Sequence, residues 1–259
     1  RITEVLENRP EPAASIVQIS EGEADAAVEF RNVTFRYTGA EEVVLQDINF
    51  TVEKGKTTAV IGSTGSGKST IACLLMRFYD IENGNILIDG KDVREYPQEE
   101  LRDKIGYVPQ KAFLFSGTIA DNLRHGKKDA TEKEMYHAVK TAQIDDFITN
   151  LEKGLESPVS QAGSNFSGGQ KQRLSIARAL IRKPEIFIFD DSFSALDFKT
   201  DARLRKALKQ DVSESAVIIV AQRISTILDA DQIIVLNEGS IVGTGTHKEL
   251  PVSYTHLTL

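Results

Sequence analysis

Thr58-Ala-Val-Ile61, directly followed by Gly62-Ser-Thr-Gly-Ser-Gly-Lys68-Ser69, is the stretch that decides the fold class of this 259-residue chain. The apolar run predicts a buried parallel strand, and the segment after it has the glycine spacing of a phosphate-binding loop. In such a loop, backbone N–H groups point at phosphate oxygens, and the N-terminus of the following helix adds positive charge. The loop therefore predicts a nucleotide site made by Gly62, Ser63, Thr64, Gly65, Ser66, Gly67, Lys68, Ser69 and Thr70.

Two side chains of this loop and one further aspartate have separate expected roles. Lys68 should reach the outer phosphates, and the Ser69 hydroxyl should bind Mg²⁺, which prefers hard oxygen ligands. A second metal ligand is expected at Asp190, which follows four apolar residues at 186–189. That run predicts a central strand buried on both faces, and open α/β sheets bind ligands at the carboxyl ends of such strands. A cap on the next turn is the alternative role for Asp190.

A second anion-binding feature lies between these two motifs. Ser167-Gly-Gly-Gln170 precedes a segment whose apolar residues at 174, 176, 177, 180 and 181 predict an amphipathic helix. Exposed N–H groups and the dipole at the start of that helix both favour phosphate. One nucleotide rarely needs two such sites from one chain. The phosphate that the second site would bind is therefore not explained by the first nucleotide.

With these motifs the chain resembles the nucleotide-binding domain of ATP-binding-cassette (ABC) proteins over roughly residues 27–250. The resemblance implies an α/β P-loop NTPase: a RecA-like core with an antiparallel β subdomain at about 27–110 and 184–250, and an inserted helical subdomain at about 111–183. In this family two domains close head to tail, so that each ATP lies between one P-loop and the other domain's Leu-Ser-Gly-Gly-Gln signature. Here phenylalanine replaces the leucine, and the residues expected to face the partner's ATP are Phe166, Ser167, Gly168, Gly169 and Gln170.

The resemblance assigns roles to three further residues. Tyr37 matches the aromatic residue that stacks on adenine, with an aromatic on an edge strand as the alternative reading. Gln110 matches the glutamine that contacts magnesium and senses the transmembrane partner, with an ordinary loop amide as the alternative. Asp197, in Ser194-Ala-Leu-Asp197, matches a loop that crosses to the opposite subunit in the closed dimer, with a helix cap as the alternative.

Two departures from the family pattern concern catalysis. Asp191 stands where the family has the glutamate that polarises the attacking water, and its side chain is shorter by roughly 1.5 Å. Gln222 stands where the family has a histidine, and an amide cannot carry positive charge. Together with Lys68, these residues predict a slow catalytic site, of the kind that one subunit of a heterodimeric exporter carries. A sluggish homodimeric ATPase is the alternative.

Composition agrees with one α/β domain and argues against other classes. A chain of 259 residues with 41% hydrophobic and 27% charged residues can bury a substantial core. The net charge of -7 argues against binding to nucleic acid, which requires a basic excess. The single cysteine, Cys73, excludes an internal disulfide and suits a reducing compartment. The four histidines lack metal-ligand spacing, so no metal beyond Mg²⁺ is expected. ATP and Mg²⁺ are the cofactors that the phosphate-binding loop and the resemblance imply.

The two ends of the chain are interpreted separately from the domain. No apolar run reaches the 18 or so residues that cross a bilayer. Residues 1–26 resemble the linker that follows the transmembrane domain in exporters with fused domains. This resemblance predicts attachment to the cytoplasmic face of the cell membrane through that upstream domain. Residues 251–259 are interpreted as a tail of foreign origin.

The function expected from the resemblance is ATP hydrolysis coupled to efflux by an exporter of the multidrug or lipid type. One alternative is a soluble ABC ATPase acting on DNA or ribosomes, which would add a long coiled-coil insertion or a second cassette in tandem. Another is a regulatory module that binds ATP without turnover, which an ATPase measurement would distinguish.

Overall fold

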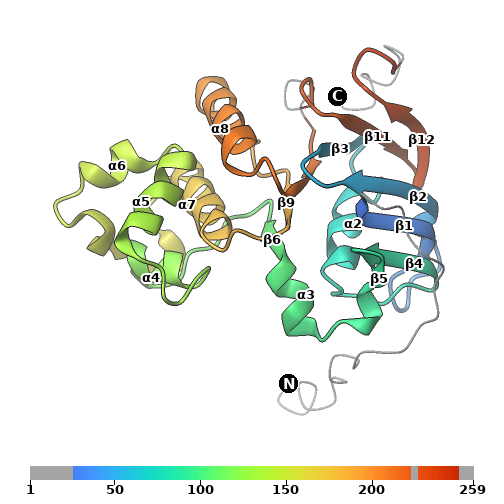
Figure 1. The fold of residues 1–259 in the computed structure, drawn as a ribbon, viewed down its shortest axis with the longest axis horizontal. Helices are drawn as coiled ribbons and strands as arrows, with labels where there is room; N and C mark the ends of the chain where they lie inside the picture. Colours follow the sequence, from blue (N-terminus) through green and yellow to red (C-terminus); the bar gives the residue numbers. More distant parts are fainter. Residues whose placement is uncertain (1–25, 223–226, 251–259) are drawn as a thin grey trace.

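The fold of the chain is seen in a computed structural model that describes residues 26–222 and 227–250 (Figure 1). Two sheets lie on one side of the molecule and a group of helices lies on the other. The predicted linker, apart from Ala26, and the predicted tail lie outside the described residues. Among the described helices, none combines the length and the apolar composition that a bilayer crossing requires.

The central layer is a six-stranded sheet in which one edge strand is antiparallel and the other strands are parallel. In sheet order the strands are β12 (Ser240–Gly245), β11 (Gln232–Asn237), β3 (Thr57–Gly62), β10 (Ala216–Val220), β9 (Ile186–Asp190) and β6 (Ile105–Val108). β9 and β10 are buried along their whole length, which explains their continuous apolar sequences. The predicted strands at 58–61 and 186–189 are confirmed. Because β3 and β9 are both parallel to β10, the phosphate-binding loop and Asp190 reach the same edge of the sheet.

The second sheet is antiparallel and covers the helix that follows the phosphate-binding loop. Its strands, in order, are β2 (Leu45–Glu53), β1 (Ala26–Phe35), β4 (Asn83–Ile88) and β5 (Lys91–Asp92). One apolar cluster joins Phe30 of this sheet, Ile71 of α2 (Lys68–Leu75) and Ile218 of the central sheet. The helix α2 is therefore packed in an apolar core between two sheets. This packing fixes the position of the phosphate-binding loop, which precedes the helix.

The helices of the opposite side come from the segment between β6 and β9, and they form the inserted helical subdomain. They are α4 (Ile119–Arg124), α5 (Glu132–Thr141), α6 (Asp145–Thr149) and α7 (Gly168–Leu180). Thr118, Thr131 and Ser167 begin α4, α5 and α7 with capping boxes, which satisfy N–H groups that a helix start leaves unpaired. Outside this group, α3 (Gln98–Lys104) precedes β6, and α8 (Phe198–Asp211) follows β9.

The helical subdomain also contains a short strand pair that the sequence did not predict. β7 (Gly117–Thr118) pairs with β8 (Pro158–Val159), in a segment expected to be helical throughout. Two residues per strand are too few to show a periodicity of two, and a proline in a strand pattern argues against a strand. Three short 3₁₀ turns, η1 (Val93–Glu95), η2 (Gly154–Glu156) and η3 (Gln161–Gly163), complete the described elements.

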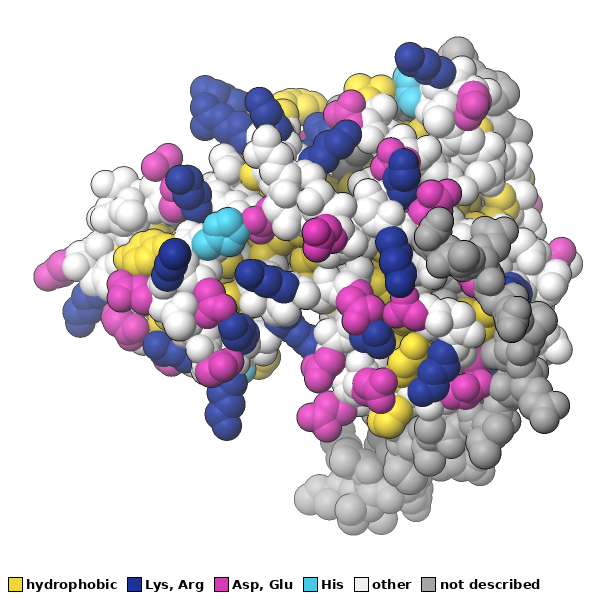
Figure 2. Space-filling view, in the orientation of Figure 1, with side chains coloured by type: hydrophobic (Ala, Val, Ile, Leu, Met, Phe, Trp, Pro, Cys, Tyr) yellow, Lys and Arg dark blue, Asp and Glu magenta, His cyan; other side chains and the backbone are white. Residues whose placement is uncertain are grey.

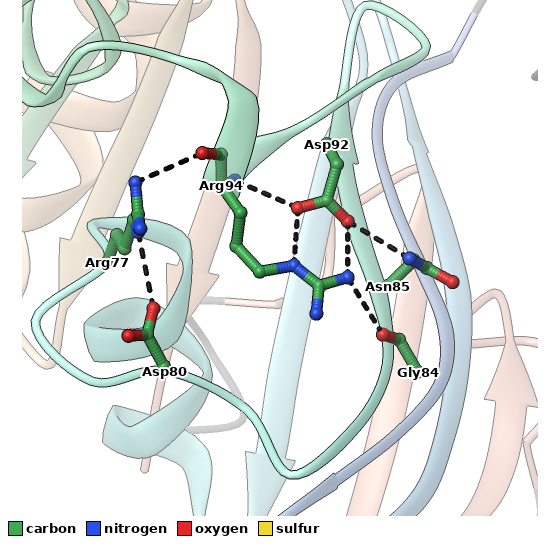
Figure 3. Close-up of polar contacts among 6 residues, drawn as sticks. All are labelled: Arg77, Asp80, Gly84, Asn85, Asp92 and Arg94. Atoms are coloured by element: carbon green, nitrogen blue, oxygen red, sulfur yellow. Dashed lines mark hydrogen bonds and ion pairs between the residues drawn. The ribbon is translucent and has the colours of Figure 1, made fainter. Parts of the chain in front are cut away.

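A partly buried ionic network fixes the chain just after α2 (Figure 3). The Arg77 guanidinium donates to the Asp80 carboxylate at 3.2 Å and to the backbone oxygen of Arg94 at 3.3 Å. Arg94 in turn makes a two-pronged bond with Asp92, with both distances 2.8 Å. Asp92 is fully buried, and Asn85 also donates to it, at 3.1 Å. The network therefore ties the end of α2 to β4, β5 and η1.

Charge is mixed over the face of the molecule shown in Figure 2. Acidic and basic side chains alternate over the helical subdomain and over the sheets, and basic side chains gather at the upper edge above α8. The prediction that the chain does not bind nucleic acid rests on its net charge, and it stays a prediction.

Candidate functional site

The phosphate-binding loop between β3 and α2 is folded so tightly that two of its glycines admit no side chain. Gly62 has a φ of 151°, and an added Cβ would lie 2.0 Å from the backbone oxygen of Leu236. Gly67 caps α2 with a φ of 98°, and its Cβ would lie 2.6 Å from the Leu45 side chain. Both positions therefore require glycine, which keeps the loop against the edge of the sheet.

Lys68 is buried, and its side chain folds back over the loop. Its Nζ donates to the backbone oxygens of Gly62 at 2.9 Å and Ser63 at 2.7 Å. Burial lowers the pKa of Lys68, and the nearby Asp191 and Asp190 carboxylates oppose that shift. A third partner is the Ser66 hydroxyl, at 3.5 Å. A charged donor bonded to neutral oxygens gains energy when it bonds an anion instead, because hydrogen bonds between two charged groups are stronger.

Asp190 lies at the end of β9, in direct contact with the loop. The Ser69 hydroxyl donates to its Oδ1 at 2.9 Å, and the Tyr107 hydroxyl donates to its Oδ2 at 3.3 Å. Burial raises the pKa of Asp190, and these two hydrogen bonds partly oppose the shift. Burial and the nearby Asp190 charge raise the pKa of the Tyr107 phenol, which keeps it a donor. The structure thus places two of the predicted metal ligands, Ser69 and Asp190, side by side.

Asp191 is held in a strained conformation at the same edge of the sheet. Its φ is 45°, in the left-handed region that costs energy for a residue with a side chain. Its N–H donates to the backbone oxygen of Val220 at 2.9 Å, and its own oxygen accepts the Ser194 hydroxyl at 2.8 Å. The Gln110 amide nitrogen donates to its Oδ2 at 3.0 Å. The backbone of Asp191 is therefore fixed, and its carboxylate is oriented by Gln110.

Tyr37 follows β1 and reaches the loop from the second sheet, so it does not lie on the edge strand of the alternative reading. Its hydroxyl is 3.1 Å from the Thr70 hydroxyl on α2. Its ring is nearly perpendicular to the rings of Phe35 and Tyr79, at centroid distances of 4.9 Å and 5.0 Å. These contacts hold a half-buried aromatic ring at one end of the phosphate-binding loop.

Tyr37, much of the phosphate-binding loop, Gln110 and the two aspartates border a single cleft of about 460 Å³, whereas Gly62, Ser63, Ser66 and Tyr107 do not line it. Gln222, which is exposed, completes one wall of it. The residues that line the cleft are Tyr37, Val44, Thr64, Gly65, Gly67, Lys68, Ser69, Thr70, Gln110, Asp190, Asp191, Val220 and Gln222. The cleft has room for a nucleotide, with an aromatic ring, a phosphate-binding loop and two carboxylates along its walls.

The second predicted anion site does not belong to this cleft. Ser167 caps α7, and its hydroxyl accepts the Gln170 N–H at 3.3 Å while the Gln170 side chain accepts the Ser167 N–H at 2.7 Å. Ser167 and Gly168 are exposed, and a Cβ added to Gly168 would meet no atom within 4 Å. Phe166, by contrast, is buried against Phe147, with ring centroids 5.8 Å apart. The N-terminus of α7 is therefore accessible at the surface of the domain.

The loop that ends at Asp197 packs beside this cap. A Cβ added to Gly169 would lie 3.3 Å from the backbone oxygen of Ala195. Asp197 caps α8, because its carboxylate accepts the Thr200 N–H at 3.0 Å. That hydrogen bond lowers the pKa of Asp197. The exposed residues Ala195 and Asp197 thus adjoin the open start of α7.

Comparison with known proteins decides the family. The family model described as ABC transporter matches residues 45–194, which include the phosphate-binding loop, the Ser167 cap and both aspartates. The chain belongs to the ABC transporter ATP-binding family. The α/β P-loop NTPase fold expected from the sequence is confirmed, and so is the family's ATP-binding function.

The relatives of this ABC domain are ABC transporter proteins, and some of them are named as exporters. An uncharacterized ABC transporter ATP-binding protein of Mycobacterium tuberculosis is 53% identical over 86% of this chain and 38% of its own length. The "Putative multidrug export ATP-binding/permease protein YgaD" of Bacillus subtilis is 42% identical over 89% of this chain and 40% of its own length. A solved bacterial Atm1-family ABC exporter with ATP bound matches with a TM-score of 0.90 and 36% identity, over 99% of this chain and 45% of that one. The chain therefore spans less than half the length of each of these three proteins.

The donor atoms of the ABC domain suit a magnesium ion that is shared with a nucleotide. Within the described residues, no cluster of three His, Cys, Asp or Glu side chains could hold a metal ion alone. The Ser69 hydroxyl and the Asp190 carboxylate offer two adjacent hard oxygens. Magnesium is commonly held by one or two protein oxygens, substrate phosphates and waters, so this set fits.

Two contacts in the ABC site were not anticipated from the sequence. Tyr107 donates to Asp190, and Tyr79 packs against Tyr37. Tyr107 lies three residues before Gln110 at the end of a strand, so its position was a usable signal. Tyr79 follows the helix of the phosphate-binding loop, and nothing in its local sequence points to Tyr37.

Proposed function

We propose that this chain is the motor domain of an ABC exporter, and that it binds ATP with Mg²⁺ and hydrolyses ATP slowly at its own cleft. The full protein would carry a transmembrane domain upstream of the linker at residues 1–26 and would place this ATP-binding domain at the cytoplasmic face of the cell membrane. The names of the relatives support an exporter of the multidrug type. The observation that carries the proposal is the single cleft that joins Tyr37, the loop around Lys68 and the Asp190–Asp191 pair.

The cleft accounts for each part of ATP. Tyr37 would stack on the adenine, since a base and an aromatic ring bind through their faces. The loop and the start of α2 would hold the phosphates. Lys68 would exchange its two backbone carbonyls for phosphate oxygens, and its buried charge would then neutralise the triphosphate.

Ser69 and Asp190 would hold the magnesium ion, with Gln110 at its edge. The ion would neutralise charge on the phosphate oxygens and help to stabilise the departing phosphoryl group. Tyr107 would keep the Asp190 carboxylate oriented through its hydrogen bond. Asp190 would therefore serve to bind the metal ion, and Asp191 would be the residue that assists the attacking water.

Asp191 and Gln222 would make hydrolysis slow without preventing ATP binding. Phosphoryl transfer to water depends chiefly on positioning and charge stabilisation. The Asp191 carboxylate is one methylene shorter than that of glutamate, and its backbone is fixed by Val220 and Ser194. The side chain therefore cannot reach further toward a water molecule. Gln222 lines the cleft as a neutral amide.

The Ser167 cap would serve the ATP of a second ABC domain, placed head to tail. It is exposed, lies outside the cleft of its own chain, and adjoins the exposed loop at Asp197. The asymmetry of the motifs supports a heterodimer, because the cap is intact while the hydrolytic residues of this cleft are altered. This chain would then complete a fast site that belongs to its partner.

Two single variants test the proposal on the 259-residue chain. Lys68→Ala should abolish the binding of ATP with Mg²⁺, measured by titration calorimetry. Ser167→Arg should leave the binding of ATP to the monomer unchanged but remove the remaining hydrolysis at every protein concentration. If Ser167→Arg weakened binding to the monomer as much as Lys68→Ala did, the cap would belong to the chain's own site and the two-domain proposal would fail.

A further inference from the structure

We propose that Tyr79 is a positioning residue for ATP binding, because it fixes the ring of Tyr37 in the orientation that accepts the adenine. This inference rests on the proposed function of Tyr37. Tyr79 does not line the cleft, so it would act through Tyr37 and not by touching the nucleotide.

The evidence begins with three aromatic rings in mutual contact. The Tyr37 and Tyr79 rings are 5.0 Å apart and cross at 88°. On the β1 strand, Phe35 crosses Tyr37 at 82° with a centroid distance of 4.9 Å, and it also contacts Tyr79 at 5.8 Å. Two perpendicular neighbours at these distances oppose rotation of the Tyr37 ring, because edge-to-face pairs are directional.

The hydroxyl of Tyr37 supplies another fixed point. It lies 3.1 Å from the Thr70 hydroxyl on α2, the helix whose N-terminus would hold the phosphates. The ring is therefore fixed at its tip by Thr70 and along its body by Phe35 and Tyr79. Of these neighbours, Phe35 is fully packed in the core, whereas Tyr79 is 45% exposed and can be replaced with little disturbance elsewhere.

Tyr79 itself sits in a segment that is tied down at both ends. On one side, Arg77 closes the turn by binding Asp80, and it is anchored to the backbone of Arg94 in the network of Figure 3. On the other side, the N–H of Glu82 donates to the backbone oxygen of Thr34 at 3.2 Å.

An ion pair strengthens the second attachment next to Tyr37. The Glu82 carboxylate binds the Arg36 guanidinium, at 3.0 Å and 3.3 Å for its two oxygens. Arg36 immediately precedes Tyr37 in the chain. Hydrogen bonds and ion pairs therefore hold the segment that carries Tyr79, so that its ring stays against Tyr37. A positioning role requires such a fixed ring.

The test compares the binding of two ligands to four variants of the 259-residue chain by titration calorimetry with Mg²⁺. ATP reports the base and the phosphates together, whereas inorganic tripolyphosphate reports the phosphate loop alone. Tyr79→Ala should weaken ATP binding about threefold to tenfold, the scale of one aromatic pair. It should leave tripolyphosphate binding unchanged, and Tyr79→Phe should restore ATP binding. Phe113→Ala, which removes an aromatic side chain that is 50% exposed, should change neither.

Tyr37→Ala separates this inference from the function on which it rests. If Tyr37→Ala weakens ATP binding selectively and Tyr79→Ala does not, the inference is wrong while the role of Tyr37 stands. If Tyr37→Ala has no effect, the proposed adenine contact is wrong and Tyr79 has nothing to position. If Tyr79→Ala weakens both ligands equally, or its ATP defect is not rescued by Tyr79→Phe, Tyr79 has a general structural role and the inference is overturned.

Discussion

Replacing Asp191 with glutamate should convert the slow cleft into a faster one. The backbone at this position is held by Val220 and Ser194, so the added methylene would carry the carboxylate roughly 1.5 Å further into the cleft. A misplacement of about 1 Å at a catalytic group can cost on the order of a hundredfold in rate. We therefore expect Asp191→Glu to raise kcat about 10- to 100-fold, which corresponds to about 1.4–2.7 kcal/mol of barrier.

The assay is steady-state phosphate release from ATP with Mg²⁺, measured at several concentrations of the 259-residue chain. KM should change little, because the contacts expected to bind ATP lie at Tyr37 and the phosphate-binding loop. Asp191→Asn keeps the shape of the side chain and removes its charge, so it should lower kcat below that of the unaltered chain. A kcat that stayed constant in both variants would show that position 191 does not limit hydrolysis, and the account of the slow site would be refuted.

Three further predictions concern stability. Asp190→Asn should raise Tm by about 1–4 °C near pH 7, because a buried carboxylate with a raised pKa destabilises the fold once it ionises. The same change should weaken ATP binding with Mg²⁺, because it removes the proposed metal ligand. An unchanged or lower Tm would contradict the first expectation. Hydrogen bonds from Lys127 and Thr131 lower the pKa of Glu134 to about 2, so its contribution to stability should be complete above about pH 4.5 and lost toward pH 2. The difference in Tm between the unaltered chain and Glu134→Gln should accordingly shrink over that range, and a constant difference would contradict the assignment. Gly62→Ala should lower Tm and abolish ATP binding, because its Cβ would lie 2.0 Å from a backbone oxygen, and normal behaviour in both assays would contradict the steric argument.

The parts of the site that the sequence predicted are those fixed by local backbone geometry. A phosphate-binding loop is specified by its own glycines, as the steric requirements at Gly62 and Gly67 show. The meeting of Ser69 with Asp190 could also be predicted, because parallel strands bring their carboxyl ends to one edge.

The parts that were missed depend on how distant segments pack. The hydrogen bond from Tyr107 to Asp190 and the contact of Tyr79 with Tyr37 join residues that are far apart in sequence. The position of Tyr107 near Gln110 offered a signal for the first contact, but no local pattern encodes the second. Gln110 was expected to contact magnesium, and the structure adds that its amide nitrogen is bound to Asp191. Side-chain pairing of this kind becomes visible only when the sheets and helices are assembled.

The central claim is that one ATP is shared between the loop of one domain and the Ser167 cap of another. A complementation experiment tests it most directly, in a chain that carries Asp191→Glu and Gln222→His so that hydrolysis is measurable. Lys68→Ala and Ser167→Arg in this background should each be inactive alone. When they are mixed in equal amounts, half of the random dimers regain one intact site, so about a quarter of the parent activity should return. A mixture that stays as inactive as its two components, while the parent chain is active, would contradict the claim.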